Sequence, residues 1–337
     1  MAKRVIVNRY VRRAAEIPLR AFAILTAPIL KLMARAGIGS GDYLKRGVLP
    51  VPVHFYQPVF DPDSIPAAVW ERRSQMPGVA FDPDAQLAFL DRLAEFAPEC
   101  SWPEHATGRR GYHSQNSSFG FSSACLLHCV VRHLRPSQVI EVGAGMSTLL
   151  LEASLEANER DTGHRGRLVS IDPYQHAGVR EAASMRKPTS MPEPPPDEHL
   201  LVAAEVQTVP LERFTSLQAG DLLFIDSSHV VRTGGDVNFL YLEVLPRLAP
   251  GVVIHIHDIQ IPYEYHRDYS AASGAARLYW TEQYLLQAFL TLNTEFTVLL
   301  AGYWLQRDHT ERFAALFPTW DPDAHRPTTS FYLQRCR

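Results

Sequence analysis

The fold is decided by ten residues near the middle of the chain, Val139-Ile140-Glu141-Val142-Gly143-Ala144-Gly145-Met146-Ser147-Thr148. The apolar residues Val139, Ile140 and Val142 suit a strand that is buried on both faces of a parallel sheet. Gly143 and Gly145 allow a sharp turn and a close approach of the backbone to a ligand. The residues after this turn predict a helix, whose first turn has free N–H groups. The stretch therefore predicts a strand, a glycine turn and a helix that together cradle a nucleotide-like cofactor.

Strands and helices alternate downstream of this stretch, which is typical of a parallel sheet with helices on both faces. We expect further strands at residues 167–172, 200–206, 221–226, 252–258, 296–300 and 330–333. Helices are expected at residues 84–97, 121–134, 177–185, 237–248 and 281–292, and the proline-rich segment 187–196 is expected to be a loop. The predicted fold is α/β, a Rossmann-like, doubly wound, mostly parallel sheet of seven strands with a helical N-terminal extension.

The composition is that of an ordinary globular protein, with 46% apolar and 20% charged residues in a chain of 337. The net charge of −3 argues against a nucleic-acid partner. The four cysteines form no C-x-x-C pair, so we expect small buried side chains in a reduced compartment. A cytoplasmic location is the corresponding prediction.

The N-terminal region has a composition of its own. We expect a basic amphipathic arm at residues 1–60, a helical lead-in at 61–135 and a catalytic domain at 136–337. The first fifty residues hold ten Lys/Arg against two Asp/Glu. Their apolar run at residues 21–30 is about half a membrane span, so we expect neither a transmembrane helix nor a signal peptide. The arm is expected to contact an anionic membrane surface, its own domain or a second subunit.

Three short strings narrow the choice of cofactor. A dinucleotide site would place glycine or alanine where this chain has Thr148, which disfavours a nicotinamide cofactor. The strings EVGAGMST (141–148), FIDSSH (224–229) and HIHDI (255–259) occur in this order at the ends of predicted strands. In them the chain resembles the class I S-adenosylmethionine-dependent methyltransferases, within a bacterial group that carries similar strand-end strings. The resemblance implies S-adenosylmethionine as cofactor and antiparallel final strands.

The resemblance also implies which residues hold the methionine end of the cofactor. Backbone amides of the loop formed by Gly143, Ala144, Gly145 and Ser147 would meet the methionine carboxylate. The side chain of Glu141 would meet the amino group.

The nucleoside end of the cofactor is expected beside Asp172, which ends the second predicted strand. Open α/β sheets bind ligands at such strand ends, and a carboxylate has lone pairs for both ribose hydroxyls. A turn-capping role before Pro173 is the alternative for this aspartate. Gln207 is a candidate near the adenine, and Asp226 is a further cofactor candidate.

Acceptor chemistry is expected at Asp226, His229, His257 and Asp258, because neighbouring strands lie only about 4.8 Å apart. In related methyltransferases, acids at these positions hold a divalent metal, which implies a metal site at Asp226, His257 and Asp258. Oxygen ligands favour Mg²⁺, and imidazoles also admit Mn²⁺, Fe²⁺ or Zn²⁺. The metal-free alternative makes His229 or His257 a general base. His255 lies deeper in its strand and is expected to be a buried core residue.

We therefore expect methyl transfer to a hydroxyl of a small molecule or saccharide. The aromatic segment 262–269 and residues 280–284 are expected near this acceptor. Three alternatives stay open: a nicotinamide oxidoreductase, an inactive cofactor-binding module, and a metal-dependent hydrolase or oxygenase that uses His229, His255, His257 and Asp258.

Overall fold

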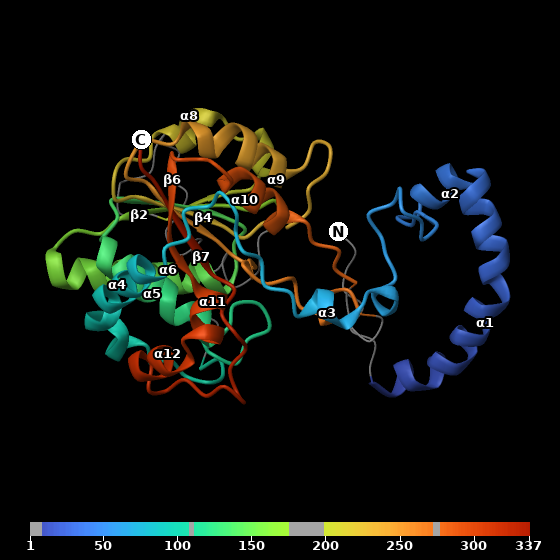
Figure 1. Ribbon diagram of the computed structural model, residues 1–337, viewed down its shortest axis with the longest axis horizontal. Coiled ribbons are helices and arrows are strands. Elements are labelled where there is room, and N and C mark those ends of the chain that lie inside the picture. Colours follow the sequence, from blue (N-terminus) through green and yellow to red (C-terminus); the bar gives the residue numbers. More distant parts are fainter. Residues whose placement is uncertain (1–8, 108–110, 175–198, 272–276) are drawn as a thin grey trace. The chain divides into compact units, whose positions relative to one another are not determined.

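The computed structural model describes residues 9–107, 111–174, 199–271 and 277–337 (Figure 1). The chain divides into two compact units. The N-terminal unit comprises Met1–Ala67 and Arg267–Tyr279, and the sheet unit comprises Ala68–His266 and Trp280–Arg337. Each unit is described by itself below.

The sheet unit is built on seven strands in the order β3-β2-β1-β4-β5-β7-β6. These are β1 (Gln138–Val142), β2 (Arg167–Ile171), β3 (Leu200–Val202), β4 (Leu222–Ile225), β5 (Val253–Ile256), β6 (Phe296–Ala301) and β7 (Phe331–Arg335). The first five pair in parallel, and every residue of β4 and β5 is buried. The continuous apolar runs in these strands are explained by burial on both sheet faces. The predicted Rossmann-like sheet of seven strands is confirmed.

The last two strands differ in direction. β7 pairs antiparallel with both β5 and β6. Because β6 runs against β7, it runs in the same direction as the first five strands. Of the two final strands, only β7 is therefore antiparallel to the rest of the sheet.

Helices cover both faces of the sheet, with α4, α5 and α6 on one side and α8, α9 and α10 on the other (Figure 1). The first group is α4 (Pro83–Leu93), α5 (Phe121–Leu134) and α6 (Met146–Thr162). The second group is α8 (Leu211–Thr215), α9 (Asp236–Phe239) and α10 (Glu282–Leu290). The remaining helical elements of this unit are α3 (Ala67–Trp70), η2 (Ala94–Glu99), η3 (Val206–Thr208), α11 (Gly302–Asp308) and α12 (Thr310–Leu316). This two-sided arrangement confirms the doubly wound prediction.

Several predicted elements are shorter or less regular than the sequence pattern indicates. β3 ends at Val202, residues 203–205 are irregular, and a turn of 3₁₀-helix begins at Val206. The predicted helix at 237–248 is α9 followed by a π-type segment, η4 (Leu240–Val244), and a 3₁₀ turn, η5 (Leu245–Arg247). Pro246 lacks an N–H and prevents regular α-helical bonding there. The helix expected at 177–185 and the loop expected at 187–196 lie outside the described residues.

A buried polar network joins α5 to its neighbours. The Arg132 guanidinium donates to both carboxylate oxygens of Glu99, at 2.8 and 3.0 Å, and to Asn158 Oδ1 at 2.6 Å. His128 contacts Glu99 from the next turn of the same helix. Burying a guanidinium is tolerable because its donors are matched by carboxylate and amide oxygens. Cys100, Cys125 and Cys129 are free and buried beside this network.

The N-terminal unit contains one long helix, α1 (Arg9–Ala36), followed by α2 (Ser40–Leu44), η1 (Pro62–Ser64) and η6 (Arg267–Tyr269). α1 includes Pro18 and Pro28 and bows along its length (Figure 1). Its segment Glu16–Ala36 is long and apolar enough to cross a membrane by length and composition, and none of it is buried. The apolar helix is thus longer than the uncharged run at residues 21–30, and Pro28 lies within it.

Candidate active site

The glycine turn after β1 brings two strand ends into close contact. Gly143 has a left-handed backbone, with φ +88°, and its N–H donates to the Ile171 carbonyl at 2.9 Å. A Cβ atom at this position would lie 1.9 Å from the carbonyl oxygen of Asp226. Glycine is therefore required here both for the backbone conformation and for the approach of β4.

Glu141, on β1, is completely buried and bound by hydroxyl groups. Ser147 and Thr148 donate to its two carboxylate oxygens at 2.7 Å each, and Ser170 donates to the second oxygen. Ser170 lies directly across from Glu141 in the β1–β2 pair. Burial raises the pKa of Glu141 to about 7, although the three hydroxyl donors favour the ionised form. We call this group the Glu141 site; it ties β1, β2 and α6 together.

The amides of the glycine loop also have partners within the chain. Ala144 donates its N–H to Asp172 Oδ2, and Gly145 donates to Thr148 Oγ1, each at 2.9 Å. With Gly143 bound to Ile171, the three successive amides of this turn are all engaged. The turn uses these three donors to hold its own shape, and the contact of the loop amides with the methionine carboxylate stays a prediction.

A cavity of about 250 Å³ opens at the carboxyl ends of β1, β2 and β4. Four of the predicted cofactor residues line it: Gly143, Asp172, Gln207 and Asp226. The other four predicted cofactor residues lie outside its lining: Glu141, Ala144, Gly145 and Ser147. The strand order reverses between β1 and β4, and open α/β sheets bind ligands at this switch point.

Asp172 is fixed within this cavity by two backbone groups. Its Oδ2 accepts from Ala144, and its Oδ1 accepts from the N–H of Tyr174. The side chain is buried but faces the cavity. A carboxylate oxygen has two lone pairs, so it can accept a hydrogen bond from a ligand hydroxyl as well as from a backbone amide. The turn-capping and ligand-binding roles of this aspartate are thus compatible.

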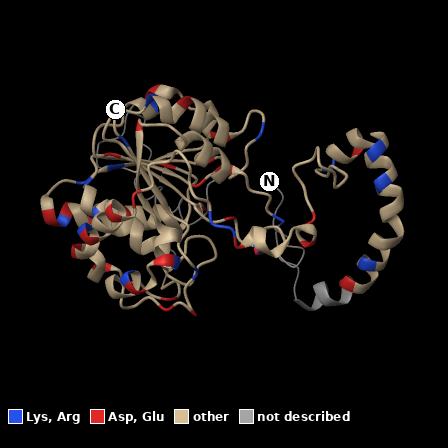
Figure 2. Ribbon diagram, in the orientation of Figure 1, with Lys and Arg blue, Asp and Glu red and all other residues tan. Residues whose placement is uncertain are grey.

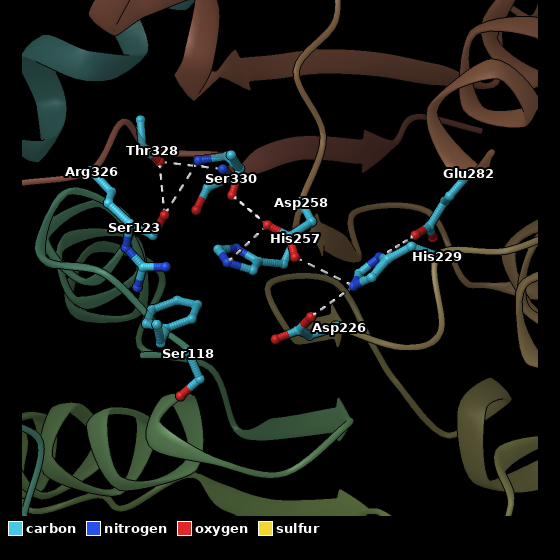
Figure 3. Close-up of polar contacts among 12 residues, drawn as sticks. Ser118, Ser123, Asp226, His229, His257, Asp258, Glu282, Arg326, Thr328 and Ser330 are labelled. Carbon is cyan, nitrogen blue, oxygen red and sulfur yellow. Dashed lines mark hydrogen bonds and ion pairs between the residues drawn. The ribbon is translucent and has the colours of Figure 1, made fainter. Parts of the chain in front are cut away.

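Beside the cavity, two strand ends form an acid–histidine cluster of Asp226, His229 and Asp258 (Figure 3). His229 Nε2 lies 3.2 Å from Asp226 Oδ1 and 3.5 Å from Asp258 Oδ2. One potential ligand atom from each residue lies within 4.8 Å of the others. Asp226 follows β4 and Asp258 follows β5, which are neighbouring strands.

The backbone of the cluster is unusual at two points. His229 and Asp258 have left-handed conformations, with φ +60° and +57°. Such values are disfavoured for side chains with a Cβ, and they are found where a structure over-determines a functional geometry. These two turns direct the His229 ring and the Asp258 carboxylate toward each other.

A third acid, Glu282 at the start of α10, holds the other side of the histidine ring. His229 Nδ1 lies 2.7 Å from Glu282 Oε2, and the glutamate is fully buried (Figure 3). Thr329 Oγ1 donates to Asp258 Oδ1 at 2.9 Å. The sequence had placed residues 280–284 near the acceptor without assigning Glu282 a role, and it gave no signal for Thr329.

Neighbouring charges and burial shift the pKa values of the groups in this cluster. Burial opposes the charged imidazolium, but the carboxylates of Asp226 and Glu282 raise the pKa of His229 well above its ordinary value. Burial acts to raise the pKa of Asp226, yet the neighbouring His257 and His229 hold it below its usual range. Burial raises the pKa of Glu282. Three carboxylates thus surround a single imidazole, and the arrangement has an excess of negative charge that favours a bound cation.

The two other predicted histidines are not members of this three-residue ligand set. His257 Nε2 is 3.8 Å from Asp258 Oδ1, and its ring packs 4.7 Å from that of Phe119. His229, rather than the predicted His257, therefore completes the closest ligand set with the two aspartates. His255 is fully buried and stacks on Tyr332, with ring centroids 4.4 Å apart. Burial lowers the pKa of His255 well below its ordinary value, as expected of a neutral core residue.

The sheet order, the glycine turn and the cavity at the switch point define the sheet unit as a Rossmann-like α/β domain. In agreement, residues 140–259 match the family model described as "Methyltransferase domain". This match runs from the middle of β1 past the end of β5 and includes the acid–histidine cluster. A comparison with curated proteins found no match.

Several solved structures are similar in fold. A candidate methyltransferase from Thermobifida fusca YX is 15% identical, covers 81% of this chain and 98% of its own, and gives a TM-score of 0.40. The plantazolicin methyltransferase BpumL, in complex with a pentazolic desmethylPZN analog and SAH, is 12% identical over 64% of this chain and 84% of its own, with a TM-score of 0.34. The 16S rRNA (adenine(1408)-N(1))-methyltransferase from Catenulisporales acidiphilia is 12% identical, covers 66% of this chain and 95% of its own, and gives a TM-score of 0.29.

Proposed function

We propose that the sheet unit uses S-adenosylmethionine to methylate a hydroxyl oxygen of a small molecule or saccharide, with a divalent metal held beside the cofactor. The observation that carries this proposal is the double position of Asp226. It lines the cavity at the switch point and also belongs to the acid–histidine cluster. A cofactor in the cavity and an acceptor at the cluster would therefore meet at this residue.

The cavity offers the groups that a nucleoside cofactor needs. Asp172, fixed by the amides of Ala144 and Tyr174, would accept the ribose hydroxyls. Gln207 lies in the lining after β3, where an adenine edge would be reached. S-adenosylmethionine supplies an electrophilic methyl group on a sulfonium, so the protein mainly has to position the acceptor and manage its proton.

The acid–histidine cluster fits a divalent metal. Asp226, His229 and Asp258 offer two carboxylates and one imidazole nitrogen at mutual distances within 4.8 Å. Glu282 holds the opposite ring nitrogen of His229, which is the usual outer partner of a metal-bound histidine. Carboxylate-rich sites of this kind favour Mg²⁺ or Mn²⁺.

The metal and metal-free mechanisms differ in how the acceptor hydroxyl loses its proton. A divalent cation lowers the pKa of a bound hydroxyl, which would assist its deprotonation. Without a cation, His229 lies between carboxylates that keep it protonated, and a protonated imidazole cannot act as a general base. The metal-free alternative therefore falls to His257, which is near Asp258 but outside the closest ligand set.

The bonds of Thr148 in the glycine turn argue against the oxidoreductase alternative. Thr148, at the place of the third glycine, donates to Glu141 and accepts the Gly145 N–H. A side chain with two such bonds fills the position where a dinucleotide site needs close helix–strand packing.

Calorimetry with S-adenosylhomocysteine and with NAD tests the cofactor. We expect binding of the former only. Asp172→Ala should weaken this binding by about tenfold or more, because bonds to a buried carboxylate are lost. Asp258→Ala should retain binding of the same compound but lose methyl transfer to any hydroxyl acceptor that the wild type accepts. No affinity of the wild type for S-adenosylhomocysteine would overturn the proposal, and equal loss of binding in both variants would overturn the division of roles.

A further inference from the structure

The apolar helix α1 of the N-terminal unit has no cover among the described residues of its unit. Its large apolar side chains are exposed from Ile17 to Leu32. Exposed apolar surface on this scale is unusual for a globular protein and marks a binding surface. The charges on the helix indicate what that surface binds.

From Glu16 onward, the charged residues of α1 form a single stripe. Glu16, Arg20, Lys31 and Arg35 follow one another at spacings of 4, 11 and 4 residues, each close to a whole number of helical turns. Glu16 and Arg20 pair along this stripe, at 3.7 Å. The large apolar residues with spacings of 3, 4 and 3 residues lie on the opposite side of the helix: Phe22, Leu25, Ile29 and Leu32.

The spacing of these charges distinguishes a helix that spans a membrane from one that lies along its surface. Only the ten residues 21–30 between Arg20 and Lys31 are free of charge, which corresponds to about 15 Å of helix against a hydrocarbon core of about 30 Å. A spanning orientation would therefore bury both cations in hydrocarbon. A helix that lies along the surface keeps its charged stripe in the headgroups and buries only the opposite face.

The distribution of charge points to an anionic surface. Residues 1–50 hold ten Lys/Arg and two Asp/Glu, whereas the remaining 287 residues hold 23 and 34. Figure 2 marks the Lys and Arg positions along the described part of α1 in blue. Basic residues beside an apolar helix face are attracted to anionic lipid headgroups.

The same unit exposes an aromatic turn. Phe55 and Tyr56 are each 81% exposed, and their ring centroids lie 4.2 Å apart. The turn is closed by the Gln57 N–H, which donates to the His54 carbonyl at 2.8 Å. Aromatic rings with a polar tip are favoured at membrane interfaces.

We propose that α1 is an interfacial helix that anchors this chain to an anionic lipid bilayer through its Phe22–Leu25–Ile29–Leu32 face. Attachment of this kind makes the protein a peripheral membrane protein without a spanning segment. The proposal rests on the N-terminal unit and is independent of the chemistry proposed for the sheet unit.

Vesicle flotation of the full chain tests the proposal. We expect the protein to float with phosphatidylcholine vesicles that contain about a third phosphatidylserine, and to float less when the salt concentration is raised. Leu25→Asn should lower vesicle affinity by about tenfold, because a buried leucine side chain is lost from the lipid face. Ile24→Asn is the matched control, since Ile24 is 74% exposed and Leu25 76%, but Ile24 lies on the charged stripe. Ile24→Asn should leave vesicle affinity within about twofold of the wild-type value.

Each other outcome would overturn the proposal. Absence of flotation with anionic vesicles would exclude a lipid anchor. Equal loss in the two variants, with flotation that resists high salt and alkaline carbonate, would indicate a spanning helix. A change of oligomeric state in Leu25→Asn, measured by light scattering and without loss of flotation, would show that this face binds a second copy of the chain. Unchanged thermal unfolding of both variants establishes that the chain remains folded.

Discussion

Two acid-containing groups lie near the carboxyl ends of neighbouring strands and are built in opposite ways. Glu141 is fully buried, whereas Asp226 and Asp258 are only partly buried. In the Glu141 site, one carboxylate receives three hydroxyl donors, and its pKa is raised to about 7. In the acid–histidine cluster, three carboxylates including Glu282 share one imidazole. The first group is satisfied within the chain, and the second has more negative charge than its own donors can balance.

The difference teaches how to separate structural acids from functional ones. A buried acid with enough neutral donors stabilises the fold and needs no ligand. Acids that crowd a histidine, on a backbone held in left-handed conformations, retain charge that a ligand can use. The following predictions test this distinction, from the largest expected effect to the smallest.

Removing one carboxylate from the acid–histidine cluster should weaken metal binding strongly, whereas removing the carboxylate of the Glu141 site should leave it unchanged. We expect Asp258→Asn to weaken Mn²⁺ binding by more than about 100-fold, because a direct ligand is lost. Glu141→Gln should leave Mn²⁺ binding within about twofold, because the Glu141 site lies outside the cluster. Calorimetric titration of Mn²⁺ into each variant measures both effects.

Asp221→Asn provides a control at the other end of β4. This buried aspartate accepts the N–H groups of Gln138 and Gln218, at 2.8 Å each, and has no part in the cluster. It should lower stability without changing Mn²⁺ affinity. If Asp258→Asn and Asp221→Asn bind Mn²⁺ equally well, the cluster is not a metal site.

The glycine between the two groups gives the largest expected effect on stability. Gly143→Ala should lower the free energy of unfolding by about 3 kcal/mol or more, because of the left-handed backbone and the 1.9 Å approach to Asp226. Gly145→Ala is the matched control, since no atom lies within 4 Å of its added Cβ. Its effect should stay below about 1 kcal/mol. Urea denaturation of the two variants measures the difference, and equal stability would contradict the close approach of β1 and β4.

Stability of the Glu141 site should depend on pH. Since its pKa is about 7 in the fold and 4.5 ordinarily, the folded protein holds a proton between these values that the unfolded chain has released. This contribution to stability is complete below pH 4.5, falls as the pH rises and is lost above pH 7, a change of about 3 kcal/mol at most. Glu141→Gln cannot titrate and should lack this loss. Urea denaturation at pH 5, 6, 7 and 8 measures this loss of stability in both proteins. Parallel plots of unfolding free energy against pH for the variant and the wild type would contradict the assigned pKa.

The sequence predicted the sheet well because hydrophobic periodicity and glycine turns are local signals. It placed Asp172, Asp226 and Asp258 at strand ends, and the structure has them there. It did not predict that Glu141 is held by Ser170, since that contact depends on the register between β1 and β2. The acid in the strand therefore suggested a cofactor contact, whereas the structure gives both of its oxygens partners within the chain.

The choice between the two histidines was beyond sequence patterns for a different reason. His229 and His257 both follow buried strands, and their residue types are identical. Left-handed backbone conformations at His229 and Asp258 decide which ring reaches the aspartates, and such conformations leave little trace in a non-glycine sequence. Glu282 lies 53 residues from its partner His229, so only tertiary packing of α10 brings them together.

The smallest expected effect is that of Glu282, which contacts the cluster only through His229. Glu282→Gln keeps an oxygen for the Nδ1–H of His229 but removes one negative charge from the buried group. We expect Mn²⁺ affinity to fall by about 10-fold to 100-fold, as for other outer partners of a metal-bound histidine. Glu264→Gln is the matched control in the same unit, because Glu264 pairs with Arg72 and Tyr284 instead of the cluster. If both variants bind Mn²⁺ as tightly as the wild type, Glu282 belongs with Glu141 among the structural acids, and the charge excess that distinguishes the cluster is smaller by one carboxylate.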